Sequence, residues 1–498
     1  MANEKEQAAA ATEQETVEEL SLLDQIVEEG RFGKAPAAQE RGRGLVKQFV
    51  AEVLEGSIAV GEDTEAMLNA RIAQIDHLVS AQLNEVMHAE ELQRLEATWR
   101  GLHYLLAQSE TGEMLRIKVL NVPKKELLRD LTKGAAAIEF DQSQLFKKVY
   151  EEEFGVLGGA PFGALIGDYY FGRSGQDIEL LDKISKVSAA AHAPFLTAAS
   201  SDMFNLESFA DLAAPRDMAK VFDTTEYAKW KQFRDSEDSR YVALTMPHIL
   251  LREPYGRDTV PIEAFDYEEA VDGKDHDKYL WGNAAWALGA RVTQAFAQHG
   301  WCATIRGVES GGLVQGLPVH NFRTDSGEVV MKCPTETPIT DRREKELADL
   351  GFAPLIHRKN TADAAFLSVQ SAQKPKVYNK PEATASARIS AQLPYIFSAS
   401  RFAHYLKSMM RDKIGGFMSR SEAASFLNDW IADYVVANPD ASATVKAKRP
   451  LSEARIDVTE IPGKPGAYRA VAFLKPHFQL DELGVSLRLV ADLPPPAQ

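Results

Sequence analysis

The sequence has little of what secreted and membrane-embedded proteins need. Its 498 residues include two cysteines, Cys302 and Cys333, which are too few for a disulfide framework and suit a reducing compartment. No apolar run approaches the roughly 20 residues that a membrane-spanning helix requires. The first residues are acidic and polar, without the basic and then apolar stretches of a signal peptide. We therefore expect a cytoplasmic protein with no membrane insertion.

A surplus of positive charge is missing as well. The chain has 56 Lys and Arg against 72 Asp and Glu, which gives a formal net charge of −16. Half of that charge is local, because residues 1–30 hold nine acids and one lysine. Nucleic acids and anionic membranes select clusters of Lys and Arg, so the composition predicts no nucleic acid among the partners.

Familiar catalytic motifs are also absent. Gly311 and Gly316 have the spacing of a phosphate-binding loop, but Leu317 and Pro318 follow where Lys and Ser or Thr are required. The sequence has neither the His-Glu-x-x-His helix of zinc hydrolases nor the Gly-x-Ser-x-Gly turn of serine hydrolases. Since catalytic residues can be dispersed, these absences lower the expectation of an enzyme without removing it.

Three groups of polar residues could suggest a site, and each has a simpler structural explanation. The spacing of Cys302, His320 and Cys333 fits no compact zinc site. His404 lies in a helical stretch, where a packed histidine is commoner than a catalytic base. Carboxylates near a helix start are better explained by the helix dipole and by ion pairs, and they are Asp168, Asp177, Glu179 and Asp182. We expect no catalytic residue, no metal and no cofactor.

The hydrophobic pattern divides the chain into three regions. Residues 1–44 predict an acidic flexible tail with one amphipathic helix, followed by a linker from Lys34 to Gly44. Apolar residues at three- and four-residue spacing indicate the helix, and they are Val17, Leu20, Leu23 and Val27. Residues 45–375 predict an N-terminal domain, and residues 381–498 predict a C-terminal domain.

The domain at 45–375 begins with helices, to about residue 115. Two apolar stripes mark them, and such stripes usually pack between helices in a core. The stripes consist of Ile72, Ile75, Val79, Leu83 and Val86, and of Leu92, Leu95, Trp99, Leu102 and Leu106. Strand-like and helix-like runs then alternate to about residue 373, beginning with a strand at 164–171 and a helix at 177–191. This alternation is typical of an α/β body.

The domain at 381–498 combines helices with strands. Helical periodicity covers residues 383–417 and 421–436. Three short strands follow at 455–461, 468–474 and 485–491, and the first two are separated by the turn Gly463-Lys464-Pro465-Gly466. The whole chain therefore predicts a mixed α/β (α+β) fold with several domains.

Four segments resemble the large subunit of the type VI secretion contractile sheath, the TssC/VipB family. They are Glu96–Leu105, Phe162–Phe171, Phe366–Tyr378 and Arg401–Gly415. They occur in the family's order, in a chain of the family's length. The resemblance implies a structural protein rather than an enzyme, with a contractile-tail-sheath fold whose C-terminal strands are shared between subunits.

The resemblance also implies a set of partners. Members of the family pair with a small sheath subunit (TssB/VipA-like) and with neighbouring copies of themselves. The heterodimers polymerise from a baseplate around a tube of hexameric rings (Hcp-like), and contraction propels that tube. An AAA+ unfoldase (ClpV-like) then recycles the contracted sheath.

Three sets of residues are candidates for these contacts. The helix at Val17–Val27 would bind the unfoldase. Lys229, Lys231 and Arg234 lie in a densely charged stretch that would face the inner tube, although a solvated helix face is the simpler interpretation. The C-terminal strands would complete a sheet with neighbouring subunits through Ile456, Val458, Val471, Phe473, Val485, Leu487 and Leu489.

Two alternatives stay open on the sequence. The first is a sheath protein of another contractile injection system, such as a phage tail or a pyocin. The second belongs to a different class, a cytosolic α/β enzyme with a dispersed site, which would show a ligand pocket in a monomer or small oligomer.

Overall fold

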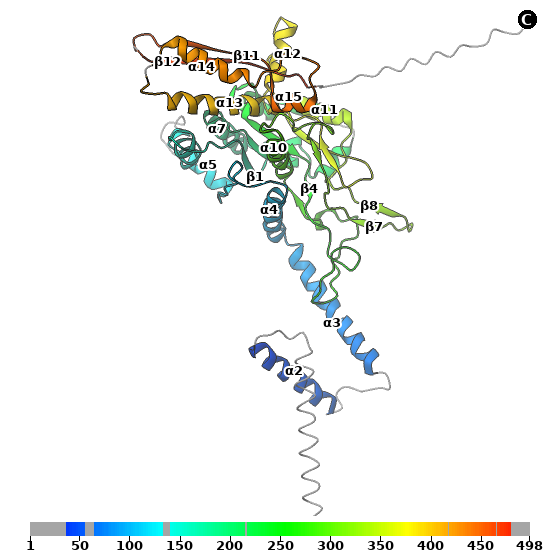
Figure 1. Cartoon of the computed structure of the whole chain (residues 1–498). Coiled ribbons are helices and arrows are strands. Elements are labelled where there is room, and N and C mark those ends of the chain that lie inside the picture. Colours follow the sequence, from blue (N-terminus) through cyan, green and yellow to red (C-terminus); the bar gives the residue numbers. More distant parts are fainter. Residues whose placement is uncertain are drawn as a thin grey trace, which may run out of the picture. The chain divides into compact units, whose positions relative to one another are not determined.

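The computed structural model describes residues 36–54, 64–132, 140–214, 217–416, 418–464 and 466–479. The chain divides into two compact units: an N-terminal unit up to Gln82 with Glu263–Tyr267, and a main unit of Leu83–Ile262 with the residues from Glu268 onward. Helices and strands are mixed (Figure 1), which confirms the expected α/β class. The predicted helix at 17–27 and the predicted strand at 485–491 lie outside the described residues.

The N-terminal unit contains α2 (Pro36–Leu54) and most of α3 (Thr64–Met87). The linker expected from Lys34 to Gly44 is therefore wrong for most of its length. Pro36 takes the first helical position, where a missing N–H loses no intrahelical bond. The Ala, Gln, Glu and Arg residues that follow are good helix formers, and they outweigh the two glycines of the stretch.

A six-stranded sheet lies at the centre of the main unit (Figure 1), in the order β1-β2-β3-β9-β10-β6. The first four strands in this order are parallel, and β10 is antiparallel to both of its neighbours. The strands are β1 (Leu165–Phe171), β2 (Phe195–Ala199), β3 (Val242–Met246), β9 (Ala353–His357), β10 (Ala364–Phe366) and β6 (Leu313–Val314). Strands β2 and β3 are buried at every position, as expected for parallel strands covered on both faces.

Successive residues of these strands enter two different cores. Phe195 and Val242 join a core with α7 (Gly175–Ala191), whereas their neighbours Leu196 and Ala243 join a core with α10 (Ala285–His299). The alternation follows from the two-residue period of a strand. The sheet is thus covered by helices on both faces, in the layers of an α/β body.

The turn from β1 into α7 explains part of the carboxylate cluster. Both elements confirm the predicted strand and helix. The Ser174 hydroxyl caps α7 by accepting the Asp177 N–H (3.2 Å). The Asp177 carboxylate accepts the Gly172 N–H (2.7 Å) and pairs with the Lys124 ammonium (2.7 Å). Asp177 therefore stabilises a turn.

Further elements complete the main unit before the C-terminal region. They are α4 (Glu90–Ala107), α5 (Lys124–Thr132), α6 (Gln144–Phe146), the π-helix Lys147–Phe154, α8 (Met218–Phe222), α9 (Ala228–Asp235), β4 (Ile249–Leu250), β5 (Trp281–Gly282), β7 (Asn321–Arg323), β8 (Val329–Met331) and α11 (Asp341–Asp349). Strand β4 pairs with β5, and β7 pairs with β8, in two small antiparallel sheets.

The C-terminal region consists of helices and one hairpin. Its elements are α12 (Pro381–Ser390), α13 (Leu393–Asp412), α14 (Arg420–Ala432), α15 (Ala443–Lys448), β11 (Leu451–Glu460) and β12 (Tyr468–Pro476). The single helix expected over 383–417 is two helices, because Pro394 lacks the N–H needed to continue α12. The hairpin confirms two predicted strands, and Gly463 and Gly466 in its turn both adopt a φ of 78°.

Candidate functional site

The C-terminal hairpin has one covered face and one exposed face. Ile456 and Val458 of β11 are buried in a core with α14, Trp301 and Phe402. Across the hairpin, Val471 and Phe473 of β12 keep 42% and 51% of their surface exposed. A two-stranded sheet is marginally stable without further packing, and here the packing comes from α14 together with Trp301 and Phe402. The four predicted residues therefore divide evenly between the core and the surface.

The two edges of the hairpin also differ. Asn428 of α14 donates its side-chain amide to the Ile456 carbonyl (2.8 Å) and accepts the Ile456 N–H (2.9 Å). Ile456 lies opposite Ala472, so these are the groups that point away from β12, and the outer edge of β11 is blocked there. By the same two-residue alternation, the N–H and C=O groups of Ala470 and Ala472 point outward from β12. In the described part of the chain, no third strand pairs with β12.

Helix α4 carries the second candidate surface. Its apolar stripe repeats at three- and four-residue spacing, the pattern of a coiled-coil seam, through Leu92, Leu95, Trp99, Leu102 and Leu106. Core packing was expected for this stripe, but Leu95, Trp99 and Leu106 are 56%, 64% and 44% exposed. The expectation is wrong for these residues, because periodicity identifies an apolar face but not the chain that covers it.

The adjoining face of α4 holds the helix on the body. Leu105 is buried with Trp286 and Ala290 of α10. Leu102 of the stripe packs against the same cluster. Gly101 lies so close to α10 that an added Cβ atom would meet the Trp286 ring at 2.3 Å. Glycine therefore allows the close approach, and it orients the helix with its stripe outward.

A buried ion network fixes α4 from a second side. The Arg252 guanidinium bonds Glu96 of α4 (2.9 Å) and the fully buried Glu269 (2.6 Å), and His88 contacts Glu269 (3.2 Å). Burial raises the pKa of Glu269, but the hydrogen bonds and charge of Arg252 lower it overall. The paired charges tie α4 to the loop after β4, since removing either partner would leave a buried charge uncompensated.

In helix α3 the predicted stripe is also exposed. The expectation of core packing is wrong for Ile72, Ile75, Val79 and Val86, and Leu83 is half-buried. Helix α3 belongs mostly to the N-terminal unit and ends in the main unit. Exposed apolar residues on this scale mark protein interaction surfaces more often than free surfaces.

The predicted tube-facing residues lie on α9, and they have different environments. Lys229 and Lys231 are exposed, and Lys231 pairs with Asp223 (2.7 Å). Arg234 is buried and donates to the carbonyls of Ala372 (3.0 Å) and Asp349 (2.9 Å). Burial lowers the pKa of Arg234 to about 10. Arg234 therefore anchors α9 to its own chain, which corrects its assignment to an outer surface.

The polar groups considered for catalysis are spread through the body. His404 is buried and bonds the Ala191 carbonyl (2.8 Å), as a packed histidine should. The Asp168 carboxylate accepts the Thr98 hydroxyl (2.6 Å), and burial raises its pKa. Cys302 and Cys333 contact different neighbours, a backbone carbonyl and a threonine hydroxyl. Among the described residues, no group of three or more His, Cys, Asp and Glu is placed to hold a metal ion.

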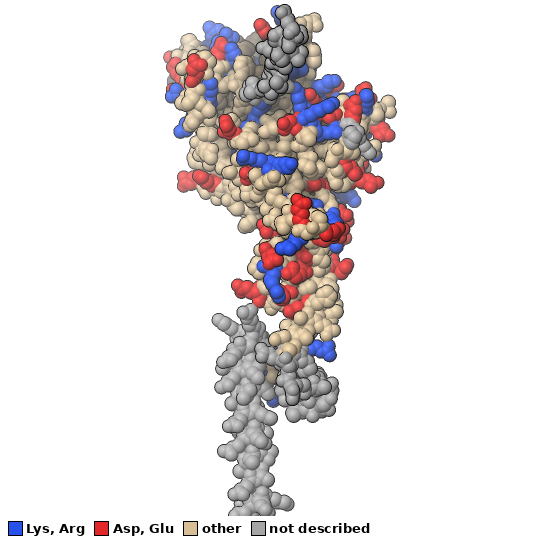
Figure 2. All heavy atoms as spheres, turned by 90° about the vertical axis from the view of Figure 1, so that its right-hand side faces the viewer, with Lys and Arg blue, Asp and Glu red and all other residues tan. Residues whose placement is uncertain are grey.

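The remaining candidates lie outside the described residues: Val17, Leu20, Leu23 and Val27 near the start of the chain, and Val485, Leu487 and Leu489 near its end. Over the described parts, no helix combines the length and the apolar character that a bilayer crossing needs. On the face shown in Figure 2, basic and acidic residues are interspersed.

Comparisons with known proteins cover almost the whole chain. Residues 69–373 match the family model for the EvpB/VC_A0108 tail sheath N-terminal domain (VipB). Residues 382–493 match the model for the EvpB/VC_A0108 tail sheath gpW/gp25-like domain. The type VI secretion system sheath protein TssC1 of Pseudomonas aeruginosa is 49% identical over 482 residues, which is 97% of each chain.

Two solved structures resemble the chain distantly. The baseplate of the anti-feeding prophage aligns with a TM-score of 0.34 and 8% identity, over 64% of this chain and 66% of that chain. Its helical sheath in the contracted state aligns with a TM-score of 0.31 and 8% identity, over 62% and 66%. The assignment rests on the family models and on the sequence relative. The chain belongs to the VipB tail sheath family, the TssC/VipB sheath proteins of type VI secretion systems.

Proposed function

We propose that this chain is the large structural subunit of a cytoplasmic contractile sheath. It forms heterodimers with a small sheath subunit, and these polymerise from a baseplate around an inner tube and contract to propel it. Its role is structural rather than catalytic. The observation that carries the proposal is the hairpin, which has a blocked edge at β11 and an open edge at β12.

The open edge of β12 suits strand addition by a neighbouring subunit. Unpaired N–H and C=O groups offer a row of main-chain hydrogen bonds, and an added strand would also cover Val471 and Phe473. The predicted strand at Val485–Ala491 has the alternating pattern that such an edge accepts. In the proposed assembly, neighbouring subunits complete this sheet for one another.

Proline at position 470 tests the open edge. Ala470 is exposed and its N–H points away from β11, so Ala470→Pro removes an outward donor while keeping the bonds within the hairpin. We expect the variant to fold but to lose long sheaths when it is co-expressed with the small subunit and viewed by electron microscopy. Ala470→Thr keeps the donor and is the matched control. Normal sheaths from Ala470→Pro would contradict strand addition at this edge.

The stripe on α4 suits a helix of the small subunit. Amphipathic helices pack against one another through apolar residues at this spacing, and a large aromatic such as Trp99 is a common anchor at such contacts. Exposed Leu95 and Leu106 extend the same seam on either side of Trp99. This contact would hold the heterodimer together independently of the hairpin.

The N-terminal helix is proposed to bind the AAA+ unfoldase. Its four apolar anchors would supply roughly 6–10 kcal/mol gross if they were buried. Ordering the helix and losing free motion reduce this figure, so one contact is weak and many copies on a sheath act together. Changing Leu20 and Leu23 to Glu should abolish unfoldase binding in a pull-down and leave the first contraction intact.

The exposed lysines of α9 are the remaining candidates for contact with the inner tube. Surface ion pairs contribute about 0–1 kcal/mol each, which suits a contact that is broken on contraction. Reversing charge at Lys229 and Lys231 together should give sheaths that separate from the tube. Tubes that stay enclosed in that variant would place the contact elsewhere.

A further inference from the structure

A stretch of extended chain without a strand partner joins α4 to α5 (Figure 1). Residues Leu115–Val122, here called the bridging segment, lie between these helices and belong to no helix or strand of the described chain. Ile117, Val119 and Val122 are β-branched, and residues of this kind favour strands. The bridging segment therefore has the composition of a strand but no strand beside it.

The bridging segment is anchored to the body near its two ends. Ile117 packs against the cluster formed by α4 and α10, and Val122 packs against the core that contains α7. The Tyr169 hydroxyl of β1 also donates to the Val122 carbonyl (2.8 Å). Between these anchors, Val119 and Leu120 are 70% and 52% exposed. The segment thus passes from one face of the central sheet to the other beside β1, with its middle uncovered.

The main chain of the bridging segment has unused hydrogen-bonding groups. Within the described parts of the chain, none of its backbone N–H groups donates a hydrogen bond. The Leu115 carbonyl accepts the Gly112 N–H (2.9 Å) and the Val122 carbonyl accepts Tyr169, but the carbonyls of residues 116–121 accept no described donor. A row of unpaired N–H and C=O groups on extended chain is a template for an added strand.

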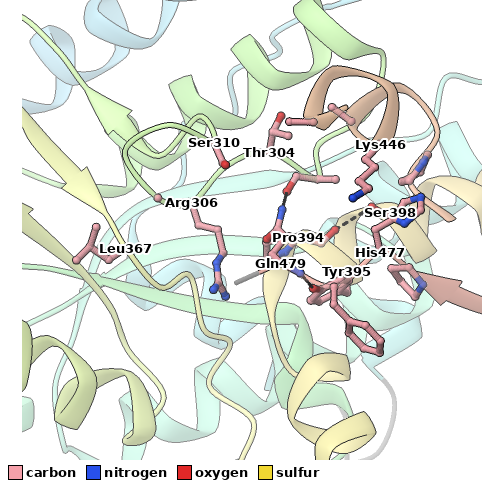
Figure 3. A pocket seen from close by; sticks show the side chains of 17 residues that line it. Thr304, Arg306, Ser310, Leu367, Pro394, Tyr395, Ser398, Lys446, His477 and Gln479 are labelled. Carbon is pink, nitrogen blue, oxygen red and sulfur yellow. Dashed lines mark hydrogen bonds between the residues drawn. The ribbon is translucent and has the colours of Figure 1, made fainter. Parts of the chain in front are cut away.

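The cavity beside the hairpin lacks such free groups of charge. It has a volume of about 260 Å³ and lies where the chain leaves β12 (Figure 3). Arg306 in its wall donates to the Gln392 side chain (3.0 Å), and Lys446 donates to the Pro439 carbonyl. The permanent charges in the described part of this wall are therefore bound within the chain. The bridging segment is the better candidate for contact with another molecule.

The charge of the bridging segment indicates the chemistry of the missing strand. Residues 114–125 contain no acid and four bases, although the whole chain has a net charge of −16. The bases are Arg116, Lys118, Lys124 and Lys125. Opposite charges on neighbouring strands stabilise their pairing. A strand that alternates apolar and acidic residues would therefore fit this surface.

The neighbouring surface indicates which chain supplies that strand. Ile117 and Leu102 pack against the same cluster, so the bridging segment adjoins the α4 stripe assigned above to the small subunit. The strand predicted at Val485–Ala491 of the large subunit is already assigned to the edge of β12. We propose that the small sheath subunit adds an apolar and acidic strand to the bridging segment. This inference rests on the proposed function and deepens it, because it gives the heterodimer a main-chain contact beside its helix contact.

Two neighbouring prolines test strand addition. Alternate N–H groups of an extended chain point to opposite sides, so an added strand uses the donor of Val119 or that of Leu120, but not both. Of Val119→Pro and Leu120→Pro, one should reduce co-purification of the small subunit about tenfold, and the other should change it less than about twofold. Val119→Thr and Leu120→Thr keep the donors and control for the side chains. Both proline variants should melt like the unaltered protein, because the donors they remove are unpaired. Equal co-purification by the two proline variants, whether normal or lost, would overturn strand addition.

Amide hydrogen exchange identifies the partner. The full-length Ala470→Pro variant, expected to form heterodimers without long sheaths, is compared with the large subunit expressed alone. Amides of the bridging segment should exchange about 100-fold more slowly in the heterodimer. Protection that appears only in assembled sheaths would assign the strand to a neighbouring large subunit and overturn the proposal. Normal sheaths from Ala470→Pro would reject strand addition at β12 alone, since the proline pair above measures heterodimer formation directly.

Discussion

The central sheet and the C-terminal hairpin are both covered by helices, but they are completed differently. The central sheet has six strands with helices on both faces, and Lys124 donates to the Tyr170 carbonyl in its outermost strand β1 (2.7 Å). The hairpin has two strands, one covered face and one open edge. The first arrangement satisfies its strands within one chain, and the second leaves groups for another chain. Together with the proposed strand addition, the comparison assigns folding and assembly to separate parts of this molecule.

The largest effect should come from the body. Trp230 of α9 is buried and stacks on Phe352 with ring centroids 5.7 Å apart. Trp230→Ala should destabilise the protein by about 3–5 kcal/mol, because it opens a large cavity in a core that cannot refill it. Guanidinium unfolding of the purified protein measures this loss. A change below about 1 kcal/mol would mean that the body itself depends on partners.

The two faces of α4 give the next contrast. Leu105→Ala should lower the free energy of unfolding by about 2–5 kcal/mol, because that side chain is buried. Trp99→Ala should change it by less than about 0.5 kcal/mol, because that side chain is mostly exposed. Conversely, Trp99→Ala should weaken co-purification of the small subunit. If Trp99→Ala destabilised the chain as much as Leu105→Ala, the outward face would belong to the fold and not to an interface.

His404 should make the stability of the body depend on pH. Burial lowers its pKa to about 4, against about 6.5 in the unfolded chain. The unfolded state therefore binds the proton first, so stability is full above pH 6.5 and falls as pH drops towards 4, by about 2–3 kcal/mol. His404→Gln should flatten this slope in unfolding experiments at several pH values. An unchanged slope would assign the pH dependence to other groups.

The smallest expected change concerns the blocked edge. Asn428→Ala leaves the Ile456 N–H and C=O without partners, at about 1–3 kcal/mol. It also exposes a second edge, so the variant should aggregate more than the unaltered protein in light scattering. Asn428→Asp keeps the acceptor and loses the donor, so it should aggregate less than Asn428→Ala and more than the unaltered protein. If Asn428→Ala stayed as soluble as the unaltered protein, other groups would have to block the outer edge of β11.

Sequence patterns predicted the elements whose causes are local. The strand at β1 and the hairpin turn at Gly463 and Gly466 follow from periodicity and from residues with special backbone freedom. The two helices around Pro394 were predicted as one, although the proline itself was a visible signal.

Other features depend on contacts between distant residues. The exposure of Trp99 follows from Gly101 meeting Trp286, which no local pattern shows. Arg234 was expected at an outer surface because it lies in a densely charged stretch. It shares a helical face with buried Trp230, and this spacing was a usable signal. The role of Asn428 depends on a strand that lies 28 residues later in the sequence.

Asn428 has a consequence for how many partners the hairpin accepts. A small sheet with two open edges can add strands at both sides, and such growth has no internal limit. With the edge at Ile456 occupied by a side chain of the same molecule, addition is restricted to the side of β12. In the proposed assembly, one amide side chain thus limits the hairpin to a single added strand, and sheets cannot grow from subunit to subunit as ribbons.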